Sequence, residues 1–184
     1  MDPRNLELPR LTKNDQAVLK NIILQAKLPD TEIAKKTGIS PQGVYKIRNK
    51  LENLGIIKGY SPIIDFKKLG INIMVLLIIK LTPEVWEKNS DDQISERIKQ
   101  IPYVINAYRI PESDASHILL MGFRDLDQRD KYLIKMQTKF SREIEIRHIY
   151  PFSVDKIITQ SPVGLLYEIL DKKEFPLEEF FLRK

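Results

Sequence analysis

The sequence of 184 residues has no cysteine and only two histidines, His117 and His148. The chain can therefore form no disulfide, thiolate metal site or cysteine nucleophile. Two histidines leave little for a zinc site or a triad, and both lie in strand-like stretches that favour structural or surface roles. Glycine-rich phosphate loops, HExxH pairs and GxSxG elbows are lacking as well. The adjacent carboxylates at 91–92 and 178–179 are typical of a helix start and of tail charges. We expect no metal, no cofactor and no enzyme activity.

Long hydrophobic runs are also lacking. The longest, residues 73–79, is far too short to cross a bilayer, and the first 15 residues do not read as a signal peptide. Hydrophobic residues make up 42% of the chain and charged residues 30%, enough for a core and a polar surface. The expectation is a cytoplasmic protein with no membrane partner.

The positive charge is concentrated in one part of the chain. Residues 1–70 carry 13 Lys and Arg against 7 Asp and Glu, whereas residues 71–184 carry 17 against 18. The whole net charge of +5 therefore comes from the first part. This asymmetry predicts one module that meets a polyanion and a second with another task.

Three helical patterns follow one another in the first module. Thr12 is a plausible N-cap for the first, Asp30 or Thr31 for a short second helix, and Ser40 for the third. Pro41 suits the first position of the third helix, because its missing N–H costs nothing there.

The spacing of Ala34, Gly38 and Val44 is that of a helix-turn-helix. This motif needs a small residue where the helices cross, a residue that tolerates the turn, and an apolar anchor on the second helix. Together with the caps, the spacing predicts such a motif.

The third helix has two contrasting faces. Its predicted buried stripe consists of Val44, Ile47, Leu51 and Leu54. The opposite stripe is Gln42, Tyr45, Lys46 and Asn49, and it contains no acid, although a solvated face usually mixes Glu and Lys. Gln and Asn can pair with adenine, while Tyr and Lys can reach base edges or phosphates.

The chain after Gly55, IIKGYSPIIDF, contains two short β-like runs around a Lys58-Gly59 turn. A hairpin after a recognition helix is a wing, with Lys58 at its tip near the phosphate backbone. Arg48 and Lys50 flank the outward stripe and are expected to contact phosphate oxygens. The predicted contacts with double-stranded DNA are Ser40, Gln42, Tyr45, Lys46, Arg48, Asn49, Lys50 and Lys58.

The second module reads as βαββαβ. The strand-like runs are INIMVLLIIKL, VINAYRI, HILLMGF and EIEIRHIYPF, and amphipathic stretches begin near Asp91 and near Asp125 or Asp127. This order predicts a ferredoxin-like sandwich with two helices on one face of an antiparallel sheet. The other face needs a cover, and dimerisation is the economical solution.

Residues 31–70, TEIAKKTGISPQGVYKIRNKLENLGIIKGYSPIIDFKKLG, followed by such a module, resemble the leucine-responsive regulatory protein (Lrp/AsnC) family of transcription regulators. The resemblance covers roughly residues 12–158 and is most specific from Gly55 to Gly70. It implies homodimers, assembling further in some relatives, that bind operator DNA through paired winged helices. It also implies an effector, often an amino acid, bound between C-terminal domains.

Three features depart from the family pattern. Many relatives have an arginine followed by an apolar residue where this chain has Ile47-Arg48, which re-aims the phosphate contact. The turn at 111–114 lacks the family's glycine; Asp114 could receive an effector's ammonium group, and an ordinary surface loop is the alternative. The tail from residue 159 is longer than usual, and its apolar residues must pack on the parent domain, on a dimer mate or on a partner protein.

The sequence thus predicts an α+β protein. A winged helix-turn-helix in 1–60 is followed by a linker in 61–70, a ferredoxin-like regulatory and dimerisation domain in 71–158 and a C-terminal extension in 159–184. The main hypothesis is a dimeric, sequence-specific transcription regulator. The alternative is an architectural or scaffold protein with weak sequence preference that recruits a partner through its C-terminal part.

Overall fold

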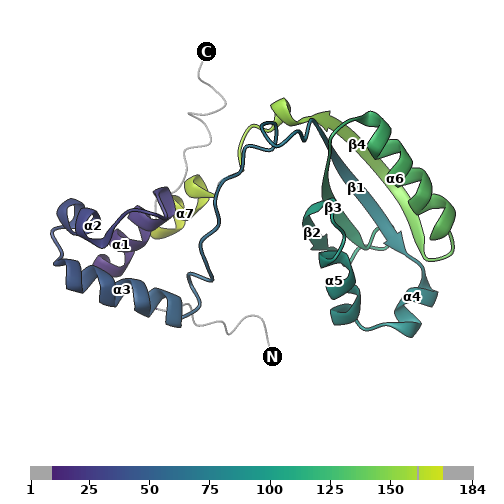
Figure 1. The fold of residues 1–184 in the computed structure, drawn as a ribbon. Helices are drawn as coiled ribbons and strands as arrows, with labels where there is room; N and C mark the ends of the chain where they lie inside the picture. The colour runs from purple at the N-terminus through teal and green to yellow at the C-terminus, as the bar shows by residue number, and fades with distance from the viewer. Residues whose placement is uncertain (1–9, 161, 172–184) are drawn as a thin grey trace, which may run out of the picture. The chain divides into compact units, whose positions relative to one another are not determined.

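The computed structural model describes residues 10–160 and 162–171. The chain divides into two units (Figure 1). The first comprises the described residues up to Ile63 and those from Gln160 onward, and the second comprises Ile64–Thr159.

The first unit contains three consecutive helices, α1 (Lys13–Leu24), α2 (Asp30–Thr37) and α3 (Pro41–Asn53). The Thr12 hydroxyl accepts a hydrogen bond from the Asp15 N–H at 3.2 Å, and the Asp15 carboxylate accepts one from the Thr12 N–H at 2.8 Å. This reciprocal pair is a capping box. Ser40 caps α3 through the N–H of Gly43, with Pro41 at the first helical position. These two predicted caps are confirmed.

The start of α2 differs from the prediction. Its N-cap is Pro29, which provides no side-chain cap, and Asp30 is already the first helical residue. The carboxylate of Asp30 is bound by Arg48 through Oδ1. The helix ends as predicted at Gly38, whose φ of 73° is in the left-handed region.

The core of this unit lies where α1, α2 and α3 meet. Its buried members are Val18, Ile22, Ile33, Ala34 and Val44, with Leu28, Ile39, Ile47 and Ile57 packed against them. Leu51 is also fully buried, but Leu54 is 48% exposed, so its predicted burial is wrong. Leu54 is the C-cap residue, and the chain turns away at Gly55, where φ is 67°.

The predicted strands of the wing do not form: residues 56–66 contain no β-strand. Two short runs with no third strand make a hairpin that is marginal in water, and Pro62 has no N–H for a ladder. The N–H groups of Ile56 and Ile57 bond instead to the carbonyl of Leu51, at 3.0 and 3.2 Å. The segment thus packs back on the end of α3.

A further helix, α7 (Val163–Asp171), contacts α1 and belongs to this first unit. Leu165 and Ile169 remain 61% and 59% exposed on it. Part of the predicted apolar tail therefore contacts the helical unit, but Leu165 and Ile169 are not buried as predicted. Its members Phe175, Phe180 and Phe181 lie outside the described residues.

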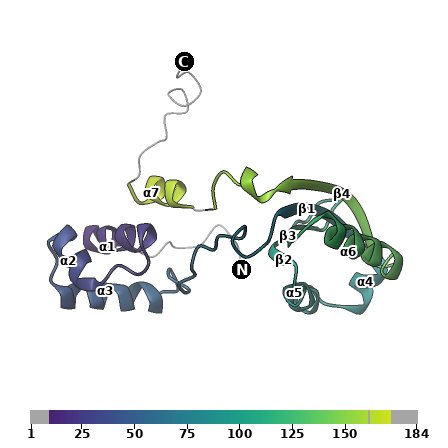
Figure 2. The ribbon, with the colours of Figure 1, turned by 45° about the horizontal axis from the view of Figure 1, so that its top comes forward.

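The second unit has the element order β1 (Ile73–Leu81), α4 (Pro83–Lys88), α5 (Asp91–Lys99), β2 (Val104–Arg109), β3 (His117–Phe123), α6 (Leu126–Lys139) and β4 (Ile144–Ser153). The strands form one antiparallel sheet in the order β2-β3-β1-β4. Helices α5 and α6 cover the same face (Figure 2). This is the predicted ferredoxin-like fold, with the short α4 as an element that the sequence pattern did not indicate. A 3-10 turn, η2 (Val154–Lys156), follows β4.

The hydrophobic core of the second unit lies between the sheet and these helices. Strand β1 contributes every second residue, and its partner β3 does the same; the fully or nearly buried members are Val75, Leu77, Ile79, Leu81, Leu119, Met121 and Phe123. The ring of Phe123 stacks on Tyr103 at 5.1 Å between centroids, and Tyr103 meets Tyr132 edge-on at 4.9 Å. These contacts attach α6 and the start of β2 to the sheet.

The other face of the sheet carries apolar residues that no element of this unit covers. Leu76 lies opposite Leu120 and Tyr150, and Ile78 lies opposite Ile118. The aliphatic side chains are only partly buried, and Tyr108 and Tyr150 are 56% and 51% exposed. We call this set the open sheet face.

Candidate nucleic-acid interface

The outward face of α3 is free of intramolecular bonds. Gln42, Tyr45 and Lys46 are exposed, and Asn49 is half-buried. Among the residues that the structure describes, the side chains of these four have no hydrogen-bond or ion-pair partner. Ser40, at the start of the same helix, uses its hydroxyl as the cap. Donors and acceptors on this face are therefore available to an external partner.

Arg48 is placed differently from the prediction. Its Nε and Nη2 donate to Asp30 Oδ1 at 2.9 and 2.7 Å, and Nη2 also donates to the Leu28 carbonyl at 3.2 Å. Nη1 donates to the Tyr60 hydroxyl at 3.1 Å, and that hydroxyl donates to Glu52 at 2.7 Å. The side chain of Arg48 is only 16% exposed. Arg48 thus ties α3 to the start of α2 and to the segment after α3, which is a folding role.

The environment of Arg48 stabilises its charge. Burial alone would lower the pKa of Arg48, but the hydrogen bonds with Tyr60 and Asp30 outweigh it and raise that pKa. The expectation that this guanidinium faces phosphate oxygens is revised, because its donors are already used within the unit. Sequence reasoning singled out Asp30 only as a helix cap and did not single out Glu52 or Tyr60. The bonded pairs are 8 to 18 residues apart, so no local spacing indicates them.

Lys50 also has an internal partner. Its Nζ lies 2.6 Å from Oδ2 of Asp15, whose side chain is 4% exposed. Burial would raise the pKa of Asp15, but the hydrogen bonds from Lys50 and Thr12 prevail and lower it. Lys50 therefore links α3 to the capping box of α1. Its side chain is still 43% exposed, and its phosphate contact stays a prediction.

These internal pairs leave the unit with a surplus of free cations. Residues 10–63 contain ten Lys and Arg against four Asp and Glu. All four acids are engaged: Asp15 with Lys50, Asp30 with Arg48, Glu32 with Lys35, and Glu52 with the Tyr60 hydroxyl. Three of the four carboxylates are thus paired with a cation of the same segment, whereas Glu52 is bonded to a neutral hydroxyl. Lys46 and the exposed Lys58 carry charges that no described residue pairs with.

Asp114, the predicted effector contact, lies exposed in the loop between β2 and β3. The backbone of this loop is held by two cations: Lys80 donates to the Ser113 carbonyl at 2.8 Å, and Arg147 donates to the Asp114 carbonyl at 2.9 Å. The Asp114 carboxylate itself has no partner among the described residues. Its role in effector binding stays a prediction.

Two other kinds of site are lacking in the described parts of the chain. Residues 10–160 and 162–171 contain no helix that is long and apolar enough to cross a membrane. The same residues hold no cluster of three or more His, Asp or Glu side chains suited to a metal ion.

Comparison with known proteins agrees with this site. Residues 11–58 match the family described as "Winged helix-turn-helix DNA-binding". The HTH-type transcriptional regulator LrpA of Pyrococcus horikoshii is 32% identical over 110 residues, which cover 60% of this chain and 72% of that protein. The chain belongs to the Lrp/AsnC family of transcription regulators. It is a DNA-binding transcription regulator, and the helix-turn-helix is the DNA-binding element of this Lrp/AsnC protein.

Other relatives extend the match. The transcriptional regulator AzlB of Bacillus subtilis is 28% identical over 124 residues, 67% of this chain and 77% of AzlB. The crystal structure of an AsnC family regulator from Agrobacterium tumefaciens shares the fold, with a TM-score of 0.65 and 22% identity over 92% of this chain and 99% of that one. A regulator from Neisseria meningitidis, solved as a complex with L-Met, has a TM-score of 0.65 and 16% identity over 83% of this chain and 94% of its own.

Proposed function

We propose that this Lrp/AsnC protein reads specific base pairs with the outward face of α3 and does so as a homodimer. The observation that carries the proposal is the state of that face: the side chains of Gln42, Tyr45, Lys46 and Asn49 have no hydrogen-bond or ion-pair partner in the part of the chain that the structure describes. A recognition helix needs such free donors and acceptors to pair with base edges in the major groove. Lys46 and Lys58 are assigned to phosphates in place of Arg48.

The open sheet face supports the dimer. Leu76, Ile78, Ile118 and Leu120 form one continuous apolar surface across two neighbouring strands, and Tyr108 and Tyr150 flank it. Burying an aliphatic side chain of this size stabilises an association by up to about 1.5–3 kcal/mol. We infer that residues 71–158 provide this assembly domain, and residues 1–60 the DNA-binding domain. Two copies would present two α3 helices to two half-sites.

The base-reading proposal is tested by selecting bound genomic fragments with the intact protein and with the double variant Gln42→Ala/Asn49→Ala. The matched control is Gln137→Ala, an exposed glutamine on α6 of the second unit. We expect a short near-palindromic motif for the intact protein and for the control. The double variant should lose about 1–3 kcal/mol of DNA-binding free energy per removed contact on that motif, and little on unrelated DNA. Enrichment without a motif, unchanged by the variants, would support the architectural alternative.

The dimer is tested by light scattering after gel filtration. Leu120→Glu places a charge at the centre of the open sheet face and should give a folded monomer, while Gln137→Ala remains dimeric. If Leu120→Glu has the molar mass of a dimer in solution, as the intact protein is expected to have, this interface is refuted.

A further inference from the structure

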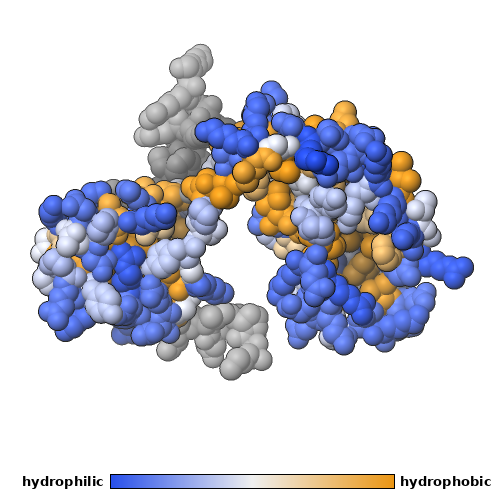
Figure 3. Space-filling model, in the orientation of Figure 1, coloured by the Kyte–Doolittle hydropathy of each residue, from blue (hydrophilic) through white to orange (hydrophobic). Residues whose placement is uncertain are grey.

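An apolar cleft runs between α5 and α6 in the second unit. Its volume is about 560 Å³, and residues from α4, α5, α6 and the sheet line it. The sheet contributes Ile79 and Leu119, α5 contributes Ile94 and Ile98, and α6 contributes Tyr132, Met136 and Phe140. Figure 3 shows this hollow with apolar atoms at its bottom and hydrophilic side chains around its mouth.

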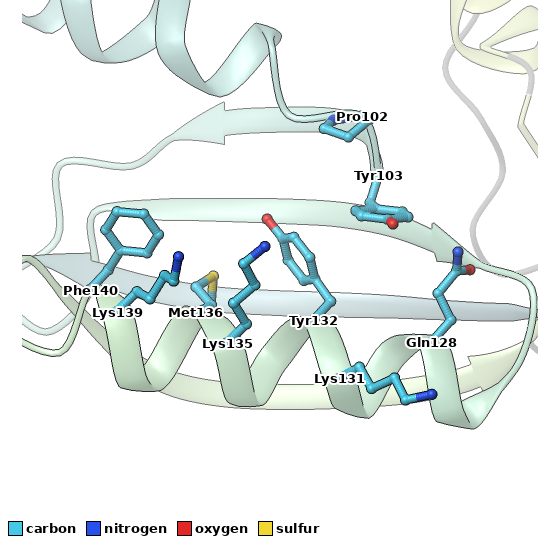
Figure 4. Close-up of a pocket in the computed structure, with 9 residues that line it drawn as sticks. All are labelled: Pro102, Tyr103, Gln128, Lys131, Tyr132, Lys135, Met136, Lys139 and Phe140. Carbon is cyan, nitrogen blue, oxygen red and sulfur yellow. The ribbon is translucent and has the colours of Figure 1, made fainter.

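The cleft continues along α6. A second hollow of about 580 Å³ shares Tyr132, Met136 and Phe140 with the first and extends past Tyr103 to Gln128 (Figure 4). We call the two hollows together the α5–α6 cleft. Its walls are aliphatic and aromatic, and polar groups occur mainly at the mouth. Such walls suit the apolar part of a ligand, and the volume is in the range of small-molecule sites.

The mouth of the cleft carries unpaired cations. On α6, Lys135 and Lys139 point to the same side as Tyr132 and Phe140 (Figure 4), and Arg97 lies on α5. These three have no ion-pair partner among the described residues. Of the two carboxylates that line the cleft, Glu84 is paired with Lys88, which leaves Glu143 against three free cations.

We propose that the α5–α6 cleft binds a small apolar carboxylate of the size of a medium-chain fatty acid. The hydrocarbon part lies among Ile94, Ile98 and Met136, where water gains few hydrogen bonds. The carboxylate lies at the mouth and accepts hydrogen bonds from Lys135 and Lys139, since charge-assisted bonds of this kind favour an anion over a neutral group. An amino acid fits less well, because its ammonium group would have to sit beside the same lysines.

This site is separate from the predicted effector contact. Asp114 is not among the residues that line either hollow. The proposal does not rest on DNA reading or on dimerisation, so binding can be measured without DNA.

The test is a calorimetric titration of the full-length protein with decanoate, and with decylammonium and decanol as ligands of the same chain length but different charge. We expect decanoate to bind in a 1:1 ratio to the chain and at least about tenfold more tightly than decylammonium. The double variant Lys135→Gln/Lys139→Gln should bind decanoate with an affinity about tenfold lower than that of the intact protein. The matched control Lys99→Gln removes a lysine of α5 that lines neither hollow and pairs with Glu96 at 2.6 Å, so the affinity of this variant for decanoate should stay within about twofold of the intact protein.

A second variant fills the cavity. Ile98→Trp on α5 should abolish decanoate binding while the circular dichroism spectrum and the DNA affinity are retained. The proposal is overturned if decanoate does not bind at about 1 mM, if decylammonium binds equally well, or if Lys99→Gln weakens binding as much as the double variant. It is also overturned if binding appears only after residues 172–184 are deleted, because the chain's own aromatic end would then be the occupant.

Discussion

Arg48 is the residue for which sequence and structure make opposite predictions. As a phosphate contact, Arg48→Ala would weaken DNA binding and leave the fold intact. As the structure has it, the guanidinium joins α3 to Asp30, to the Leu28 carbonyl and to Tyr60. The same substitution should then destabilise the helical unit.

The size of this effect follows from the exposure of the pair. Removing one partner of a buried ion pair costs about 3–5 kcal/mol, and a hydrogen bond to a charged group contributes about 1.5–3 kcal/mol. The Asp30 side chain is 25% exposed, so water can partly replace the lost donors. We therefore expect Arg48→Ala to lower the free energy of unfolding by about 2–3 kcal/mol. Arg48→Lys should lower it by about 1–2 kcal/mol, because a lysine keeps the charge but not the forked geometry.

Urea unfolding followed by two signals separates the units. Trp86 is the single tryptophan and lies in the second unit, so its fluorescence reports that unit, whereas circular dichroism also reports α1 to α3. We expect Arg48→Ala to shift only the circular dichroism transition. The control Lys46→Ala should leave both transitions in place and reduce the salt dependence of DNA binding by about one phosphate contact. An Arg48→Ala protein of unchanged stability with that reduced salt dependence would refute the folding role.

Two further predictions concern the helical unit. The pKa of Asp15 is lower in the folded chain than its ordinary value of 3.8. The unfolded chain therefore takes up the proton first, and the stabilisation by this carboxylate, complete above about pH 4, is lost as the pH falls through the lowered pKa. Acid titration followed by circular dichroism should show this loss, and Asp15→Asn should remove the dependence while lowering stability at pH 7 by about 1–2 kcal/mol. Gly38→Ala should cost about 1–2 kcal/mol in urea unfolding, because the φ of 73° is strained for alanine although its Cβ would meet no atom within 4 Å; a loss near zero would mean that the turn can relax.

Much of the local structure could be predicted because its causes are local. A capping box needs only Thr12 and Asp15, three residues apart, and Ser40-Pro41 starts a helix by its own chemistry. Short stretches of sequence likewise predict the alternation of buried residues in β1 and the order of the strands along the chain. The same holds for the outward face of α3, since helical periodicity alone separates Gln42 and Asn49 from Val44 and Leu51.

The failures have non-local causes. The carboxylate of Asp30 binds Arg48, which lies 18 residues away, and no local spacing indicates that pair. The predicted strands of the wing do not form, because two short runs with the right alternation still need a third strand or a packed face to be stable. The sequence gives no indication of the α5–α6 cleft, because the cleft depends on how far apart two helices lie on one sheet.

What the sequence by itself determined is therefore the order of elements, the excess of positive charge before residue 71 and the membership of a DNA-binding family. Periodicity, caps and composition depend on residues that are close in the sequence, so they can be predicted from the sequence alone. Which cations are free to meet DNA was decided only by the tertiary structure. A charged side chain pairs with whichever group folding brings within about 3 Å, and for Arg48 and Lys50 these groups are carboxylates on other helices.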